Sequence, residues 1–135
     1  MVSFLATVAL PAAAQDEADP LEQAVQAVRS AWLAHDMAAL VASSDTFRLD
    51  IPGVAVSTSL RPSQGQRLLA QYVETAQEVA FELDGLRRLA EDHAYAEMAR
   101  RYVVRGTSEE QVEMVFLGFR RIDGVWRLRE VRVRR

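Results

Sequence analysis

The chain of 135 residues contains no cysteine and no lysine, so all 16 of its strongly basic side chains are arginines. The lack of cysteine excludes disulfides, thiolate nucleophiles and zinc sites built on sulfur. The lack of lysine excludes Schiff-base catalysis. Only two histidines occur, His35 and His93, and neither has a His-x-His or carboxylate cluster beside it. We therefore expect no metal site and no cofactor.

The chain also lacks a surplus of positive charge: its 19 acidic side chains outnumber its 16 arginines, and the formal net charge is -3. Nucleic-acid binding depends on a surplus of basic side chains, so we expect no nucleic-acid partner. The charge is unevenly spread, however: residues 15–86 sum to -7, whereas residues 87–135 sum to +4. The arginine-rich second half is expected to shape the electrostatic field at the surface.

No hydrophobic run reaches the roughly 20 residues that a membrane-spanning helix requires. The apolar segment 1–10 ends at Pro11, and the small residues 12–14 follow before Gln15. This pattern is typical of a secretory signal peptide and its cleavage site, although the usual positively charged leader is missing. A short core strand is the alternative interpretation of the same segment.

The remaining length suits one domain, because a single hydrophobic core typically occupies about 100 to 150 residues. We predict a signal peptide over 1–14, a tether over 15–18 and a single domain over 19–135. The protein is then exported, to the periplasm or the medium of a bacterium, after cleavage near Ala14.

The first helix is predicted to begin at Asp19 and Pro20 and to run to about Ala34. Aspartate can cap free backbone N–H groups, proline is tolerated at the first helical position, and Glu22 fits a capping box. The apolar positions recur at steps of three and four, which is typical of one buried helix face. These positions are Leu21, Val25, Val28 and Trp32.

Two further helices and a hairpin are predicted before residue 79. Asp36 can cap a short second helix, and Ser63 with Gln66 forms the pattern of a capping box at the start of a third. Between these helices, residues 46–51 alternate apolar and polar side chains, and a turn leads to a second apolar run over 54–60. Period-two alternation is typical of a half-buried strand.

The second half is predicted to form four long strands, separated by turns. Asp123 and Gly124 form a strong hairpin signal between the last two. Arg100 and Glu130 interrupt the apolar alternation, and β-bulges would account for both interruptions. The strands are predicted over 79–89, 94–104, 111–122 and 125–133.

This order of elements resembles the nuclear-transport-factor-like superfamily, and the resemblance covers residues 21–133. It implies an α+β cone fold, with three N-terminal helices packed on a curved, mainly antiparallel sheet of four long strands plus a short hairpin. Within the superfamily the chain is most similar to small exported bacterial members of unknown function. The segments that carry the resemblance are Ala34-His35-Asp36, Ser63-x-x-Gln66-x-x-Leu69-x-x-Tyr72 and Asp123-Gly124-Val125-Trp126.

The superfamily includes isomerases, cyclases and dehydratases beside non-catalytic modules, so the fold does not decide the function. The resemblance places the oxyanion tyrosine of an isomerase on Val28, which cannot donate a hydrogen bond, and the carboxylate base on Ile51. Asp50 is one residue away and so on the opposite strand face. Asp50, His35 and Tyr72 remain as catalytic candidates. We expect instead that Asp50 faces solvent on its strand, that His35 caps the C-terminus of a helix, and that Tyr72 is a core residue with a polar tip.

The inward faces predict a small, mainly apolar cavity between the helices and the sheet. Arg100 belongs to this set, and on an apolar face it requires a carboxylate partner or an anionic ligand. We favour a bulge that turns Arg100 to solvent, and we expect Trp126 to be a packing anchor and His93 to be exposed. The predicted cavity residues are Trp32, Phe47, Leu69, Tyr72, Phe81, Met98, Arg100 and Phe116.

The outer face of the sheet is predicted to carry an apolar patch too large to leave in water, and therefore to form a homodimer. The residues assigned to this patch are Val115, Leu117, Phe119, Val131 and Val133. Five arginines alternate along the last strand, and we interpret them as a solvated strand end rather than an anion or lipid site. They are Arg127, Arg129, Arg132, Arg134 and Arg135.

Three functions are consistent with these features. The preferred one is a non-catalytic exported module that holds a small apolar ligand or assembles with itself. The second is an isomerase, cyclase or dehydratase that acts on a small molecule in the cone cavity. The third is a protein-interaction module of the cell envelope, whose arginine-rich second half contacts an acidic partner.

Overall fold

The computed structural model describes Ser3 and residues 19–135. Apart from Ser3, the predicted signal peptide (1–14) and tether (15–18) lie outside the described residues, so cleavage near Ala14 stays a prediction. Within the described part of the chain, no helix is both long and apolar enough to cross a membrane.

The N-terminal half contains the helices, which are α1 (Pro20–Leu33), α2 (Met37–Leu40) and α3 (Pro62–Val73). The predicted capping box of α1 is wrong, because Asp19 makes no side-chain hydrogen bond to the helix and pairs with the Arg88 guanidinium instead. The predicted cap of α2 is confirmed: Asp36 Oδ1 accepts a hydrogen bond from the Ala39 N–H at 3.0 Å. α1 therefore starts where the proline allows it rather than at a side-chain cap.

The start of α3 differs from the prediction by two residues. The helix begins at Pro62, and Gln64 Oε1 accepts a hydrogen bond from the Arg61 N–H at 3.0 Å. Ser63 is thus inside the first turn and is not the capping residue. Proline at the first helical position fixes the start, because its missing N–H has no partner to lose there.

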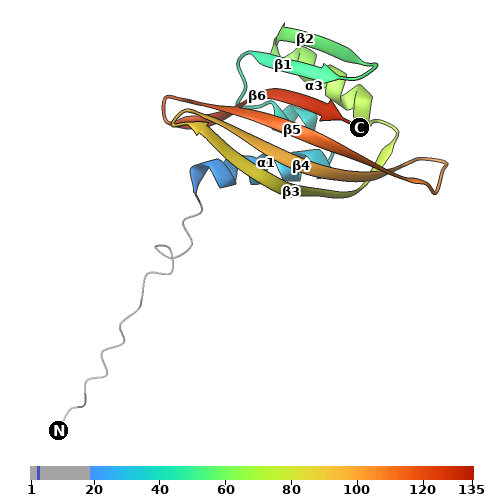
Figure 1. The fold of residues 1–135 in the computed structure, drawn as a ribbon, viewed down its shortest axis with the longest axis horizontal. Helices are drawn as coiled ribbons and strands as arrows, with labels where there is room; N and C mark the ends of the chain where they lie inside the picture. Colours follow the sequence, from blue (N-terminus) through green and yellow to red (C-terminus); the bar gives the residue numbers. More distant parts are fainter. Residues whose placement is uncertain (1–2, 4–18) are drawn as a thin grey trace.

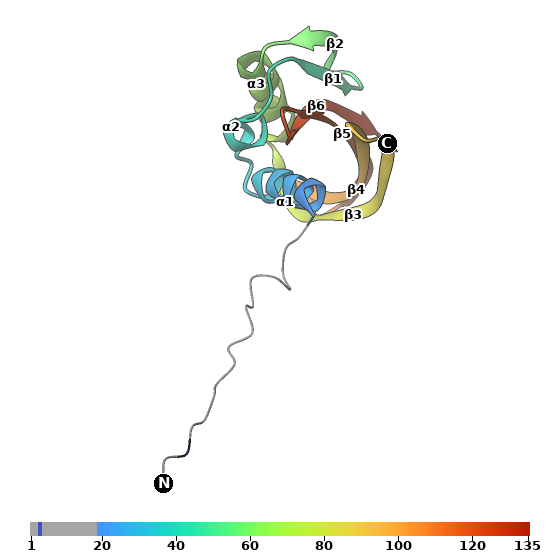
Figure 2. The same cartoon turned by 90° about the vertical axis from the view of Figure 1, so that its left-hand side faces the viewer.

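Six strands form one sheet in the order β2-β1-β6-β5-β4-β3. Neighbouring strands are antiparallel except β1 and β6, which pair in parallel. The sheet curves around the helices and stays open between its edges (Figure 1 and Figure 2). The strands are β1 (Phe47–Ile51), β2 (Ala55–Leu60), β3 (Ala76–Ala90), β4 (His93–Val104), β5 (Glu110–Ile122) and β6 (Val125–Arg134).

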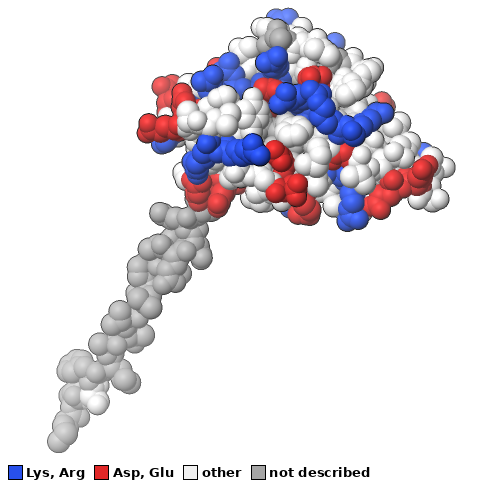
Figure 3. All heavy atoms as spheres, viewed as in Figure 1, with Lys and Arg blue, Asp and Glu red and all other residues white. Residues whose placement is uncertain are grey.

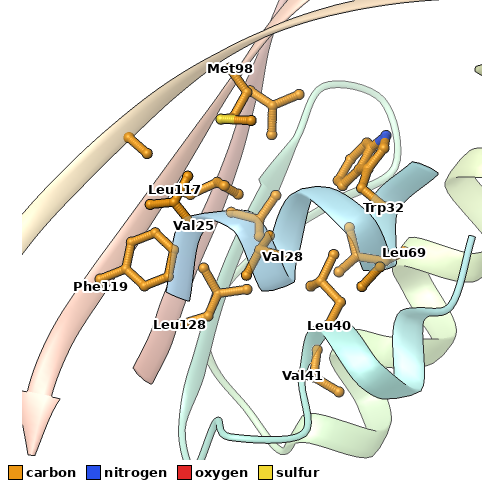
Figure 4. Close-up of a cluster of buried hydrophobic side chains, with 14 of the residues drawn as sticks. Val25, Val28, Trp32, Leu40, Val41, Leu69, Met98, Leu117, Phe119 and Leu128 are labelled. Carbon is orange, nitrogen blue, oxygen red and sulfur yellow. The ribbon is translucent and has the colours of Figure 1, made fainter. Parts of the chain in front are cut away.

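One hydrophobic core fills the space between the concave face of the sheet and α1. Figure 4 shows Val25 and Val28 of α1 pointing toward Leu117 and Phe119 of β5. All four side chains are buried, and Met98 joins them from β4. The predicted α+β class with helices packed on a curved sheet is confirmed.

The predicted dimer face is wrong, because its five residues lie on the inner face of the sheet. Val115, Leu117, Phe119, Val131 and Val133 are all members of the core and at most 1% exposed. The register pairs Met98 with Val115 and Ala96 with Leu117, so both strands direct these residues inward. Successive strand residues face opposite sides, so an assignment shifted by one residue exchanges the two faces. The homodimer prediction loses the patch on which it rested.

The two predicted bulges have opposite outcomes. Glu130 pairs with Gly118 and Leu128 pairs with Phe119, so Arg129 is the extra residue of a bulge in β6, as predicted. β4 and β5 stay in register through Arg100, which is 1% exposed. The expected exposure of Arg100 is therefore wrong. The bulge lies on β3 instead, between Glu78 and Ala80.

Candidate functional site

Arg100 is the centre of a buried ionic network. Its Nε and Nη2 atoms donate to Glu78 Oε1 and Oε2, each at 2.7 Å, and its Nη1 donates to Glu113 Oε1 at 2.5 Å. Glu113 is the direct register partner of Arg100 on β5, and the β3 bulge places Glu78 and Phe81 on the same inner face. One guanidinium thus binds two buried carboxylates, one of them in the bidentate geometry that arginine favours.

Aromatic rings enclose the guanidinium of Arg100. Its Cζ lies 3.9 Å from the Tyr102 ring centre and 5.2 Å from that of Trp32. Trp32 stacks on Phe81 with ring centres 4.7 Å apart, and its Nε1 donates to Glu78 Oε1 at 2.8 Å. Cation–π contacts of this kind are strongest where water is excluded.

His35 connects this network to solvent at the end of α1. It adopts a left-handed backbone conformation with φ of 54°, and its N–H bonds the Trp32 carbonyl at 2.9 Å. The backbone thus ends the helix as predicted, but the imidazole does not contact free helix carbonyls: its Nε2 lies 3.1 Å from Glu78 Oε2. The side chain of His35 is 26% exposed and that of Glu78 is 3% exposed.

Tyr72 binds the second carboxylate of the network. Its hydroxyl lies 2.7 and 2.6 Å from the two oxygens of Glu113, to which it donates. Burial, together with the hydrogen bond to Glu113, raises the pKa of the Tyr72 hydroxyl well above its ordinary value. Tyr72 is therefore a half-buried residue whose polar tip is satisfied, as predicted.

The charges of the network are mutually stabilised. Burial tends to raise the pKa of Glu78, but the hydrogen bond and the charge of Arg100 outweigh it and hold that pKa below its ordinary value. Burial tends to lower the pKa of Arg100, but its bonds to Glu78 and Glu113 raise it. Each oxygen of Glu78 accepts two hydrogen bonds, so this carboxylate has little capacity left to act as a base.

The predicted cavity residues are largely packed against each other. Trp32, Phe47, Leu69, Phe81 and Met98 are fully buried in the core. Trp32, Phe81, Tyr72 and Arg100 do converge, but around the two glutamates rather than around an open space. Phe116 is misassigned: it points to the outer face, where the Arg132 guanidinium lies 5.4 Å from its ring centre. The one-residue shift that exchanged the two faces of β5 explains this misassignment as well.

Three other candidates lie outside the network. Asp50 is half-buried on β1, where Arg134 Nη2 donates to its Oδ2 at 3.2 Å. β5 and β6 separate it from β4, so it does not converge with His35 or Tyr72. Trp126 is buried, which confirms it as a packing residue. His93 is half-buried rather than exposed, with its ring centre 5.3 Å from that of Tyr95.

Of the pockets formed by the described residues, three lie away from the network, and two of them have lining suited to a ligand. The first, which we call the α1–β3 groove, has a volume of about 460 Å³ and is lined by Val25 and Leu83 together with polar side chains of α1. The second, which we call the outer-face pocket, has a volume of about 270 Å³. The outer-face pocket is lined by Thr46, Phe47, Arg48, His93, Tyr95, Gly118, Phe119, Arg120, Arg129 and Glu130.

Sequence reasoning did not identify Glu78 and Glu113 as parts of a site, although a signal for one of them is present. Glu113 is in phase with Val115, Leu117 and Phe119, so alternation puts all four on one face, which the register shows to be the inner one. Glu78 is three residues before Phe81, and only the bulge brings both to one face. Among the described residues, no group of three or more histidine, aspartate or glutamate side chains could hold a metal ion.

Comparison with known proteins shows the fold. No protein-family model matches the chain, and no curated protein matches it. A ketosteroid isomerase-like protein from Erwinia carotovora atroseptica has a TM-score of 0.70 at 18% identity, over 87% of this chain and 95% of that one. A DUF4783 family protein from Bacteroides uniformis has a TM-score of 0.66 at 13% identity, over 80% and 93%.

A third similar structure is an NTF-2 like protein of unknown function from Shewanella oneidensis. It has a TM-score of 0.57 at 15% identity, over 85% of this chain and 96% of that one. The chain thus has the nuclear-transport-factor-like fold, as the sequence predicted. At these identities the similarity shows the fold alone, and the function has to be argued from the sites.

Proposed function

We propose that this chain is an exported, non-catalytic module that binds a small apolar ligand in the α1–β3 groove. The observation that carries the proposal is the groove itself. Leu83 is 40% exposed and Val25 is buried beside it, so a pocket of about 460 Å³ presents apolar surface to solvent. The rim is polar, with Glu22, Gln23 and Gln26 of α1 around it. An apolar lining with a few polar groups at its margin is the usual character of a small-molecule site.

The saturation of the ionic network supports a role without chemistry. A general base needs a lone pair that a substrate can reach. Both oxygens of Glu78 and both oxygens of Glu113 already accept hydrogen bonds from Arg100, Trp32, His35 or Tyr72. The network therefore serves to hold β3, β4, β5 and the helices together.

The sequence pattern of the N-terminus supports export. The described fold begins after the predicted cleavage site near Ala14, so removal of 1–14 takes away no helix or strand of the described part of the chain. The mature chain is then expected to begin near Gln15.

Native mass spectrometry of the protein purified from the producing cell's envelope fraction tests this proposal. We expect a mature chain near Gln15 that carries a small mass, which is lost under denaturing ionisation. Leu83→Glu places a carboxylate in the groove and is expected to abolish the bound mass. Val112→Glu is the matched control, because Val112 is 64% exposed and lies outside the groove.

Three outcomes would contradict the proposal. A mature chain without ligand, or a Leu83→Glu chain that keeps the ligand, removes the groove as a binding site. A chain that begins at Met1 in the envelope fraction removes the argument for export.

A second function is favoured by one observation, the contact between His35 and Glu78. If His35 Nε2–H donates to Glu78, Nδ1 keeps its lone pair, and it has no hydrogen-bond partner among the described residues. A carboxylate that fixes a histidine tautomer is a common way to prepare a base for proton transfer. The chain would then be an isomerase, cyclase or dehydratase that acts at the His35 end of α1.

Deuterium incorporation into a panel of ketones and hydroxy ketones tests this alternative. Catalysed exchange that is lost in His35→Gln but retained in the control His93→Gln would establish a base at His35. If the folded protein catalyses no exchange, the enzyme alternative is contradicted and the ligand-binding proposal stands.

A further inference from the structure

The outer-face pocket gathers side chains from four strands. Arg48 comes from β1, His93 and Tyr95 from β4, Arg120 from β5, and Arg129 from β6. These strands carry the pocket on the side of the sheet that faces away from the core. In Figure 3, arginine side chains form a band across this face, and acidic side chains lie mostly toward its lower edge and left end.

The arginines of this pocket are available to a ligand. Among the described residues, the Arg48 guanidinium has neither an ion-pair nor a hydrogen-bond partner. Arg120 lies 3.7 Å from Asp92, and Arg129 lies 3.4 Å from Asp45, and all four of these side chains are at least one-third exposed. Such surface pairs contribute little and exchange readily.

The shape of the pocket depends on Gly118 and on the β6 bulge. A Cβ atom at position 118 would lie 2.9 Å from Glu130 Cβ and 3.3 Å from Tyr95 Cε1, so any larger residue would fill this space. The bulge adds Arg129 opposite Gly118 and Phe119, which brings one more cation to the rim. Bulges of this kind often redirect a side chain next to a functional site.

Glu130 is the single carboxylate in the lining, and it is already engaged. The Tyr95 hydroxyl donates to Glu130 Oε2 at 3.2 Å, and Arg132 Nε lies 3.8 Å from Oε1. Its side chain is only 14% exposed. The lining therefore has three arginines and one carboxylate, and the Glu130 side chain is less exposed than any of the three arginines.

We infer that the outer-face pocket binds an oxyanion group, a phosphate or a sulfate, through Arg48, Arg120 and Arg129. Arginine forks match the geometry of such groups, and the Thr46 and His93 side chains add donors at the rim. A volume of about 270 Å³ accommodates one oxyanion with a small substituent. This site is separate from the α1–β3 groove, so it can be right or wrong independently of the proposed function.

A titration of the ¹⁵N-labelled protein with sodium phosphate, at constant ionic strength, tests the site. We expect saturable shifts of the Gly118 and Arg120 amides. Arg48→Gln is expected to weaken binding about tenfold, because it removes a charge-assisted hydrogen-bond donor. Arg67→Gln on α3 removes the same charge outside the pocket and is expected to change the affinity less than twofold.

A second pair of variants tests the opposite effect on phosphate affinity. Glu130→Gln removes the carboxylate of the lining and is expected to tighten phosphate binding several-fold. Glu97→Gln removes a carboxylate from the same face of β4 outside the pocket and is expected to have no effect. Shifts that do not saturate, or equal losses in Arg48→Gln and Arg67→Gln, would overturn the inference.

A second experiment distinguishes a lipid headgroup from a soluble oxyanion as the ligand. Co-sedimentation with phosphatidylglycerol vesicles that is lost in Arg48→Gln, but not in Arg67→Gln, identifies a lipid headgroup. Phosphate binding without vesicle binding identifies a soluble oxyanion. Both results support the pocket, whereas vesicle binding that the two variants weaken equally contradicts it as the binding site.

Discussion

Arginines meet carboxylates in two regions of this sheet, and their surroundings differ. Inside, Arg100 is fully desolvated, contacts both carboxylates of Glu78 and Glu113, and is enclosed by aromatic rings. Outside, Arg120 and Arg129 have single exposed partners at longer distances. Removing one partner from a buried ionic group leaves an uncompensated charge, whereas water solvates an exposed one. The inner arginine is therefore committed to structure, and the outer ones are free to bind.

The sharpest test of this comparison is Arg100→Ala. We expect it to lower the free energy of unfolding by about 3 to 5 kcal/mol, since it leaves two buried carboxylates without a cation. Arg48→Ala, on the outer face, is expected to change it by less than about 0.5 kcal/mol. Urea denaturation of both variants measures the difference. Equal losses would mean that burial does not separate the two regions.

The second prediction separates the two faces of β5. Leu117→Ala creates a cavity in the core and is expected to cost about 2 to 5 kcal/mol. Phe116→Ala is expected to cost less although it removes a larger side chain, because Phe116 is only partly buried on the outer face. The same denaturation experiment compares them. A larger loss of unfolding free energy for Phe116→Ala than for Leu117→Ala would indicate that Phe116, and not Leu117, faces the core.

The third prediction concerns acid. The folded-state pKa of Glu78 is lower than its ordinary value of 4.5, so the unfolded chain binds the proton more readily. Its contribution to stability is then present above about pH 4.5 and is lost as the pH falls through the folded pKa. We expect the unfolding free energy of Glu78→Gln to fall less steeply below this pH. Parallel slopes from pH 6 to pH 3 would remove Glu78 as an acid-sensitive group.

The fourth prediction concerns alkali and has a smaller effect. Because the folded state raises the pKa of Tyr72 above its ordinary value of 10, the stabilisation is present below pH 10 and is lost as the pH rises further. Tyr72→Phe is expected to cost about 1 to 1.5 kcal/mol at neutral pH and to remove this part of the alkaline loss. Denaturation between pH 8 and pH 11 measures both. An unchanged alkaline slope in Tyr72→Phe would contradict the prediction.

The smallest expected effect is at the rim of the outer-face pocket. Asp92→Asn breaks the pair with Arg120 and is expected to change stability by less than about 1 kcal/mol, because both side chains are about half exposed. The freed Arg120 should bind phosphate slightly more tightly. A large loss of stability would mean that this pair is structural, like the inner network.

Local signals predicted the helices and strands well, and failed where the faces had to be assigned. Pro20 and Asp36 mark helix starts through their own backbone chemistry, so a single sequence is enough to place them. Leu117 was placed on the wrong face, because its side follows from the register between strands, which alternation within β5 does not give. Glu78 shows the same limit, since a bulge on β3 brings it inside.

The candidate sites were less predictable than the fold. Arg100 was recognised as a residue that needs a carboxylate, but its partners are 22 and 13 residues away in sequence and on two other strands. The outer-face pocket depends on contributions from four strands and on the space left by Gly118. Neither feature has a local pattern, because each exists only once the strands are paired.

The parallel pairing of β1 with β6 has a consequence for the order of folding. Leu49 of β1 is aligned with Val131 of β6, so the β1–β2 hairpin gains its neighbour only from the last strand of the chain (Figure 1). A growing polypeptide can form the β3–β4–β5 meander first, but its sheet is incomplete until β6 has been synthesised. Contacts that close such a long loop are slow to form. If the protein is exported, its six-stranded sheet is completed only when β6 is available, so β1 and β2 join the sheet last.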